Sequence, residues 1–258
     1  DVLGNGTSLI PYQKDVLLNL VTCALVIAGG IGFPVIFELP LKHFSWKRQS
    51  MHTRVVLSTT FALLLFGTLL LKLTESISWL GAFFYSVSAR TAGFSTYNLS
   101  DFSTAGLLVV SGLMFIGASP ASTGGGIKTT TFFVLLSGIY SAATNHSERA
   151  FHNAIPKDAF RKASVISMLA VFLVMTASYL MLIFDPQLSL RDVLFEMISA
   201  FSTSGLSTGI TPQLSAQSRI LSIIMMYIGR LGPLTVASLW YFTIGERVRY
   251  PEGTIAIG

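Results

Sequence analysis

The chain has 258 residues, of which 52% are hydrophobic and only 11% are charged, and its mean hydropathy is +0.66. A soluble globular domain carries about 25% charged residues, so this composition argues against an ordinary soluble enzyme and favours a surface that faces lipid. The formal net charge is +5, but Lys and Arg are scattered between long uncharged runs, which argues against nucleic acid as a partner. The single cysteine, Cys23, excludes an internal disulfide and a thiolate metal cluster in this sequence.

Uncharged runs of about 20 residues, the length of helix that crosses the hydrocarbon, recur along the chain. They cover residues 16–37, 55–71, 102–127, 129–147 and 163–184, and a sixth run, 220–245, is interrupted by Arg230. Two semi-apolar segments, 76–88 and 189–202, are too short to span and are typical of re-entrant half-helices, with Ser76 and Ser189 as N-caps. The sequence therefore predicts an all-α, multi-pass membrane protein.

The distribution of charge predicts which loops face the cytoplasm. Threading the helices through a bilayer places residues 38–54, 148–162 and the tail from 246 on one side. These loops hold ten of the 17 basic residues, namely Lys42, Lys47, Arg48, Arg54, Arg149, Lys157, Arg161, Lys162, Arg247 and Arg249. The opposite side holds only Lys14, Lys72, Arg191 and Arg219. The positive-inside rule therefore assigns the first side to the cytoplasm and the protein to the cell membrane.

An internal repeat appears when the chain is shifted by 112 residues. Met114-Phe115-Ile116-Gly117 then falls on Met226-Tyr227-Ile228-Gly229, and Thr91 to Thr96 falls on Thr203 to Thr208. Each unit is a spanning helix, a half-helix, a Thr-x-Gly turn and a second spanning helix. The repeat predicts three segments: 1–54, the closing helix of an earlier unit with a cytoplasmic loop; 55–162, a unit with a broken closing helix; and 163–258, a last unit with a cytoplasmic tail.

The repeated turn is suited to binding a cation. Extended backbone survives at membrane depth only where its carbonyl groups face water or an ion, and in potassium-channel filters such carbonyl oxygens replace the hydration shell. Glycine lets the backbone bend with its carbonyls inward, and each half-helix aims the negative end of its dipole at the turn. The candidate ion-binding residues are Thr91, Ala92, Gly93, Phe94, Thr203, Ser204, Gly205 and Leu206. The alternative interpretation of each Thr-x-Gly is a simple turn after a helix.

Acidic residues are absent from the middle of every spanning run. A carrier that depends on an intramembrane carboxylate therefore lacks its usual proton-relay group, which favours passive conduction and predicts no enzymatic reaction. Two other functions stay open, a secondary carrier coupled to sodium or protons and a non-conducting scaffold subunit.

The run at residues 102–127 contains a helix break. Pro120 and the triplet Gly124 to Gly126 cannot remain regular helix at low cost, because each glycine costs about 1 kcal/mol against alanine. A broken, mobile segment is predicted here, and a simple glycine kink is the alternative. A nucleotide P-loop is excluded by spacing, because Ile127 separates Gly126 from Lys128.

Three stretches together closely resemble the Trk/Ktr/HKT superfamily of potassium-translocating subunits, most nearly its KtrB type. They are Ala89-Arg90-Thr91-Ala92-Gly93-Phe94, the segment from Gly117 to Thr129, and Ile228-Gly229-Arg230-Leu231-Gly232-Pro233. The resemblance covers nearly the whole chain and implies a potassium pathway, with or without sodium dependence, surrounded by four non-identical units of one polypeptide. Gly93 and Gly205 would be the third and fourth filter glycines. The first unit and most of the second are missing, so we expect further residues before Asp1.

The resemblance also implies an intramembrane gating loop beneath the filter. Its residues would be Gly117, Ala118, Ser119, Pro120, Ala121, Ser122, Thr123, Gly124, Gly125, Gly126 and Lys128, with Arg230 as a partner. A cation in hydrocarbon costs roughly 2.5 to 3.5 kcal/mol on insertion scales, so we expect Arg230 to donate hydrogen bonds to the loop; bridging of helices is the alternative. Lys128 either belongs to the gate or snorkels to the cytoplasm. Arg90 is expected to brace the half-helix.

Two partners follow from the same resemblance, a second copy that makes a homodimer and a cytosolic nucleotide-binding ring of KtrA type that binds ATP or ADP. Membrane lipid surrounds the helices, and K+ is the transported ion rather than a cofactor of this chain. The four histidines, His43, His52, His146 and His152, all fall in the cytoplasmic loops, so no metal site is predicted apart from K+ at the filter.

Overall fold

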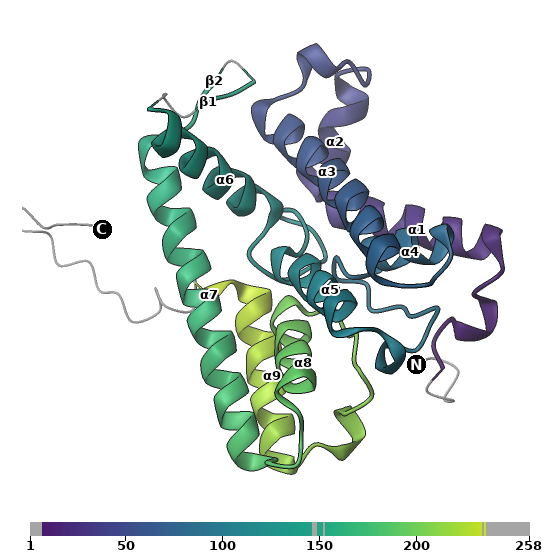
Figure 1. Ribbon diagram of the computed structural model, residues 1–258. Helices are drawn as coiled ribbons and strands as arrows, with labels where there is room; N and C mark the ends of the chain where they lie inside the picture. Colours follow the sequence, from purple (N-terminus) through teal and green to yellow (C-terminus); the bar gives the residue numbers. More distant parts are fainter. Residues whose placement is uncertain (1–6, 146–148, 152, 234, 236–258) are drawn as a thin grey trace, which may run out of the picture.

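The computed structural model describes residues 7–145, 149–151, 153–233 and 235, and these form helices joined by turns and one small hairpin (Figure 1). The helices are α1 (Val16–Ile31), α2 (Phe33–Leu41), α3 (Met51–Thr74), α4 (Trp79–Ser88), α5 (Thr104–Ile116), α6 (Thr129–Thr144), α7 (Lys157–Phe184), α8 (Leu190–Ser202) and α9 (Ala216–Leu231). Single 3-10 turns cover Ile10–Tyr12, Trp46–Arg48, Leu99–Asp101 and Thr211–Gln213. Strands β1 (Arg149–Ala150) and β2 (Asn153–Ala154) pair antiparallel.

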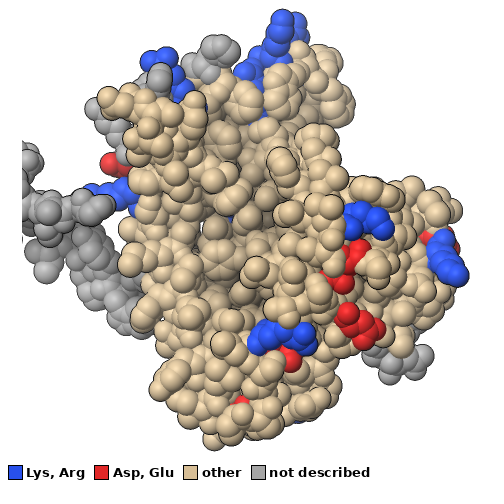
Figure 2. All heavy atoms as spheres, in the orientation of Figure 1, with Lys and Arg blue, Asp and Glu red and all other residues tan. Residues whose placement is uncertain are grey.

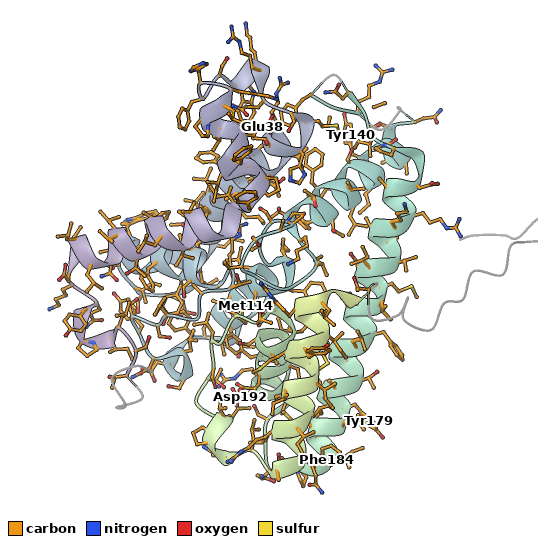
Figure 3. All side chains as sticks on the ribbon, turned by 180° about the vertical axis from the view of Figure 1, so that it is seen from behind. Glu38, Met114, Tyr140, Tyr179, Phe184 and Asp192 are labelled. Carbon is orange, nitrogen blue, oxygen red and sulfur yellow. The ribbon has the colours of Figure 1, made fainter. Side chains whose placement is uncertain are left out.

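The order long helix, short helix, turn and helix occurs twice, as α3, α4 and α5 and as α7, α8 and α9. The short helix α4 packs against α3 and α1, while α8 packs against α7, α9 and α5. The contact between α5 and α8 joins the two units, and buried Met114 of α5 lies among the helices (Figures 1 and 3). The short helices are therefore held inside a layer of longer ones.

Serine side chains begin most of these helices. Ser50, Ser78, Ser103, Ser189 and Ser215 each accept a hydrogen bond from the backbone amide three residues further on. This satisfies one of the free amide groups of the first helical turn. The N-cap predicted at Ser189 is confirmed, but the one predicted at Ser76 is wrong, because α4 begins at Trp79 and Ser78 caps it.

Three of these serines are also bound by an acidic residue at the end of an earlier helix. Glu75 accepts a hydrogen bond from the Ser103 amide at 2.9 Å, and Asp185 accepts one from the Ser215 amide at 3.1 Å. Burial of the Asp185 carboxyl opposes its ionisation, but hydrogen bonds from Ser218 and Ser215 outweigh that effect and hold its pKa below the usual value. Each of these two contacts joins the end of the long helix of a unit to the start of the helix that follows the turn. The half-helix and the turn lie between the two joined points in the sequence.

Glu38 repeats this arrangement at the other end of the molecule, where it accepts a hydrogen bond from the Ser50 amide at 2.7 Å. It thereby joins the end of α2 to the start of α3.

Within the described residues, two helices are long and apolar enough to cross a membrane, Met51–Thr74 and the segment Asp158–Phe184 of α7. The run predicted as one helix at residues 16–37 is instead two helices, α1 and α2, which meet at an angle of 96°. Gly32 causes the bend, since its φ is 89° and an added Cβ would lie 2.5 Å from the Pro120 carbonyl oxygen. In the last run, α9 ends at Leu231 before Gly232, and the expected remainder at residues 236–245 and the tail from 246 lie outside the described residues.

Large apolar side chains cover the outside of the helices. Leu73 is 83% exposed and Met168 is 79% exposed, and Tyr179 and Phe184 of α7 point away from the other helices (Figure 3). The face in Figure 2 is mostly uncharged; Lys and Arg lie at the end that carries the α2–α3 connection and the hairpin, and others lie with Asp and Glu on the lower and right parts of the face. Such an apolar outer surface is expected where the solvent is lipid.

We predict that Gly229→Ala lowers stability. An added Cβ at Gly229 would lie 1.7 Å from the carbonyl oxygen of Phe201, so α9 would have to move away from the end of α8. Overpacking of this kind costs about 1–3 kcal/mol. Gly112→Ala is the matched control, because nothing lies within 4 Å of its added Cβ. Thermal unfolding of the two purified variants in detergent measures the difference, and equal midpoints would contradict the prediction.

Candidate functional site

The third-unit turn, residues 89–96, leaves the helical conformation directly after α4. Thr91 and Gly93 have positive φ angles of 85° and 78°, and only glycine adopts such angles without strain. The Ser88 hydroxyl donates a hydrogen bond to the Phe94 carbonyl oxygen at 2.6 Å, and the Ala92 amide donates to the Ser88 carbonyl oxygen at 3.0 Å. Ser88 at the end of α4 therefore binds the turn at both Ala92 and Phe94.

The fourth-unit turn, residues 202–209, follows α8 with the same geometry. Thr203 and Gly205 have φ angles of 54° and 85°. The Ser204 amide donates to the Ser199 carbonyl oxygen at 3.0 Å, which again ties the turn to its half-helix. The main chain thus leaves helical form at both predicted Thr-x-Gly positions.

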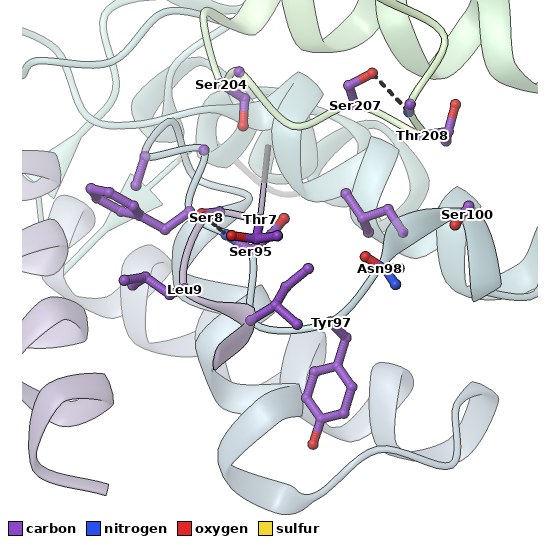
Figure 4. Close-up of a pocket in the computed structure, with 17 residues that line it drawn as sticks. Thr7, Ser8, Leu9, Ser95, Tyr97, Asn98, Ser100, Ser204, Ser207 and Thr208 are labelled. Atoms are coloured by element: carbon purple, nitrogen blue, oxygen red, sulfur yellow. Dashed lines mark hydrogen bonds between the residues drawn. The ribbon is translucent and has the colours of Figure 1, made fainter. Parts of the chain in front are cut away.

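The two turns lie against one another. An ideal Cβ on Gly93 would lie 2.3 Å from the Ser204 carbonyl oxygen and 3.3 Å from the Gly205 Cα atom, so a side chain at Gly93 would force them apart. Ala92, Gly93, Phe94, Ser204 and Gly205 line one shared cavity of about 540 Å³ (Figure 4). The three other predicted filter residues do not line it; Leu206 packs into the core beside Phe195.

The lining of this cavity combines hydroxyl and amide groups with apolar side chains. Hydroxyl and amide side chains face it, among them Ser8, Ser95 and Asn98 on one side and Ser204, Ser207 and Thr208 on the other (Figure 4). Among the described residues, no Lys, Arg, Asp or Glu lines it. Neutral oxygen atoms at the ends of two half-helices are suited to a dehydrated alkali cation.

The predicted helix break between α5 and α6 is confirmed. Helix α5 ends at Ile116 and α6 begins at Thr129, and Gly117 and Gly126 have φ angles of 66° and 77°. The Ile127 amide donates to the Phe115 carbonyl oxygen at 3.1 Å, which closes the segment at its base. Residues 117–128, hereafter the loop, therefore leave the end of α5 and return to it.

The glycine triplet of the loop contacts both turns. The Gly125 amide donates to the Ser202 carbonyl oxygen at 3.2 Å and to Thr203 Oγ1 at 3.1 Å. An ideal Cβ on Gly124 would lie 2.1 Å from Thr91 Oγ1. The glycines fit here because no side chain larger than hydrogen has room.

The opposite side of the loop rests on the end of α1. The Ser119 amide donates to the Gly30 carbonyl oxygen at 3.0 Å, and the Thr123 amide donates to the Gly29 carbonyl oxygen at 3.3 Å. The sequence placed Gly29 and Gly30 inside the apolar run at residues 16–37 and did not predict that they bind the loop. The contacts explain why α1 ends where it does.

Three cations donate hydrogen bonds to carbonyl groups of the loop. Arg230 donates to Thr123, as expected, and Lys128 donates to Gly124. Arg90 is only 6% exposed; its Nε donates to the Gly117 carbonyl oxygen at 3.3 Å. Its Nη2 donates to Thr60 Oγ1 of α3, also at 3.3 Å. Arg90 follows directly after α4, so these two bonds tie the end of that half-helix to α3 and to the loop, and its role as a brace stays a prediction.

Glu196 was not among the residues predicted from the sequence; it lies in α8 and accepts a hydrogen bond from the Thr211 hydroxyl at 2.7 Å. The Thr211 oxygen lies 2.9 Å from the Ser207 hydroxyl of the fourth turn. The repeat could have drawn attention to Glu196, because the residue at the corresponding position of the other unit, 112 residues earlier, is Phe84. An acid in place of an aromatic ring distinguishes the fourth unit from the third.

Comparison with known proteins identifies a matching family and related proteins. The family model described as "TrkH: Cation transport protein" matches residues 51–242. The chain is 35% identical over 277 residues to Ktr system potassium uptake protein D of Bacillus subtilis (strain 168), covering 100% of this chain and 60% of that protein. It is 35% identical over 271 residues to Ktr system potassium uptake protein B of Vibrio alginolyticus, covering 97% and 58%. The chain thus spans about 60% of the length of these relatives.

Among solved structures, the crystal structure of the potassium transporter TrkH from Vibrio parahaemolyticus is similar, with a TM-score of 0.71. The match covers 88% of this chain and 52% of that one at 17% sequence identity. It shows a shared fold.

We predict that Ser88→Ala loosens the third turn and leaves the fourth unchanged. The substitution removes the donor to the Phe94 carbonyl group, and a buried hydrogen bond contributes about 1 kcal/mol. Hydrogen exchange of the amides at residues 93–97 should therefore become faster. Ser100→Ala, which removes an exposed hydroxyl, is the control, and equal exchange in both variants would refute the prediction.

Proposed function

Because the chain belongs to the TrkH family of cation transport proteins, we propose that it is part of a potassium uptake protein, with the two turns forming two sides of a potassium filter. The main support is the contact of Gly93 with Ser204 and Gly205 at the ends of two half-helices. The names of the relatives, potassium uptake proteins, support potassium as the ion. No enzymatic step is involved.

The filter acts by exchange of ligands. Carbonyl and hydroxyl oxygens of the turns replace the water around K+, and the ends of α4 and α8 stabilise positive charge between them. Residues 55–162 supply the third side of the pore and residues 163–258 the fourth, while 1–54 supply the end of the second unit. In this proposal four turns complete the ring of ligands, and the turns at residues 89–96 and 202–209 are two of them.

The loop is the gate of this pathway. Gly124 and Gly125 occupy the space next to Thr91 and Thr203, so an ion leaving the filter meets the loop. Arg230 and Lys128 hold the loop through its carbonyl groups and add positive charge that opposes a cation. Opening requires that Gly125 release Ser202 and Thr203 and that Arg230 release Thr123.

Two partners fit this mechanism, a second copy of the subunit and a cytosolic nucleotide-binding ring of KtrA type that binds ATP or ADP. Helix α6 runs from the loop to the basic hairpin at Arg149, so force applied to that end of the molecule reaches the loop directly (Figure 1). Trp46 of the α2–α3 connection packs edge-on against Phe151 of the hairpin at 5.7 Å between ring centroids. These two basic connections form the docking surface in the proposal.

Substitution of the filter glycines tests conduction. Gly93→Ser and Gly205→Ser place a side chain at φ angles of 78° and 85°, with a strain of about 1–2 kcal/mol, and at Gly93 also a clash with Ser204. We expect potassium uptake into proteoliposomes to fall about tenfold and its discrimination against sodium to weaken. Gly112→Ser is the control on an open face of α5.

Unchanged uptake and discrimination in both glycine variants would support a scaffold subunit instead. Flux that does not reverse at the potassium equilibrium potential would support a coupled carrier.

Substitution of the loop tests the gate. Gly125→Ala puts a Cβ 2.7 Å from the Ser202 carbonyl oxygen and 2.9 Å from Thr203 Oγ1, which pushes the loop away from the turn. Loss of one or two hydrogen bonds of about 1 kcal/mol each should raise basal potassium flux roughly three- to tenfold. Deletion of residues 119–126 and Arg230→Ala should raise it too, while Gly112→Ala should not. Unchanged or lower flux in correctly folded variants would refute the gate.

A further inference from the structure

A second cavity, of about 270 Å³, lies behind the fourth turn. Ser204 lines the first cavity only and Leu206 the second only, whereas Gly205 and Ser207 line both. Because neighbouring residues of an extended chain point to opposite faces, the backbone of the turn separates the two cavities. The polar side chains around the second cavity are Glu196, Ser199, Ser207, Thr211, Arg219 and Ser222.

Glu196 has an incomplete set of partners in this cavity. Its side chain is only 9% exposed, and its Oε1 accepts the hydrogen bond from Thr211, but its buried Oε2 has no hydrogen-bond partner. Within the described part of the chain Glu196 forms no ion pair, because the guanidinium of Arg219 donates to the Pro212 carbonyl oxygen at 3.0 Å. A buried carboxylate oxygen without a partner is costly, so a ligand is expected there.

The third unit shows that this cavity is not a general need of the fold. Phe84 occupies the position of Glu196, is 1% exposed and packs with Cys23 and Val87. The space beside it has no room for a water molecule. The third turn is therefore backed by packed side chains, and the fourth by a cavity that contains one carboxylate among polar and apolar side chains.

We propose that the cavity behind the fourth turn binds one alkali cation, with Glu196 as the charged ligand, and that the bound ion supports the turn from behind. Glu196 supplies one charged oxygen ligand, and hard oxygen atoms suit alkali ions, whereas divalent ions favour several carboxylates. The hydroxyls of Thr211 and Ser222 donate to Glu196 and to the Ser218 carbonyl oxygen, so each oxygen keeps a lone pair that can face a cation. This site rests on the proposed function but lies outside the ion path.

The link to the turn passes through side chains. Thr211 lies 2.9 Å from Ser207, and the Ser207 hydroxyl accepts a hydrogen bond from the Gly209 amide at 3.0 Å. An ion at Glu196 and Thr211 therefore restrains residues 205–209 without touching the first cavity. Its loss should change how well the filter discriminates between ions.

Anomalous diffraction from crystals of the full-length protein in Tl+ tests the site. In the wild type we expect one group of peaks between the turns and a separate peak beside Glu196. Glu196→Gln keeps the shape and removes the charge, so it should lose the second peak and retain the first. Asp158→Asn, at an exposed carboxylate in the first turn of α7 away from both cavities, should retain both. In proteoliposomes, Glu196→Gln should reduce potassium-over-sodium discrimination about threefold or more, and Asp158→Asn should not.

The outcomes separate the site from the proposed function. Peaks between the turns with none beside Glu196 in the wild type, or with water or Arg219 bound there, overturn the second site and leave the filter intact. No peaks between the turns overturn the filter itself. If Glu196→Gln retains the second peak, Glu196 is not the ligand. The wild-type map decides the question of the site even if that variant fails to fold.

Discussion

Irregular backbone inside a membrane must find hydrogen-bond partners within the protein, and this constraint organises the centre of the molecule. The loop satisfies it by binding three other elements. Gly125 donates to Ser202 below the fourth turn, Thr123 donates to Gly29 at the end of α1, and Ile127 donates to Phe115 at the end of α5. The loop and the turns therefore behave as one hydrogen-bonded unit, and a movement of the loop must break bonds to the fourth turn.

The two repeats share an architecture but divide its tasks. In the third unit the helix after the turn breaks into the loop, whereas α9 of the fourth unit continues to Leu231 and carries Arg230 at the position of Ala118. Arg230 then donates to the loop of the other unit. The same asymmetry places Glu196 behind one turn and Phe84 behind the other. The two copies therefore differ in the side chains that surround their turns.

The acid and serine pairs explain how such short half-helices keep their place. Helix α4 has 10 residues and α8 has 13, lengths at which an isolated helix is marginal in water. Glu75 joins the end of α3 to the start of α5, and Asp185 joins the end of α7 to the start of α9. Each half-helix and turn is therefore fixed at both of its ends. The glycine turns are consequently presented at a defined depth.

Much of the fold and of the candidate site followed from the sequence, because those features depend on local composition and spacing. The apolar runs, the repeat, the two Thr-x-Gly turns and the break at the glycine triplet are all properties of neighbouring residues. The bend at Gly32, the cap at Ser78 rather than Ser76, the partners of Arg90 and the cavity at Glu196 were decided by the tertiary structure. Gly32 packs against Pro120, and Arg90 donates a hydrogen bond to Gly117. These residues are far apart in the sequence, so no periodic pattern of neighbouring residues predicts their contact. Composition determined that polar backbone must exist at the centre of the membrane, and packing alone selected the groups that satisfy it.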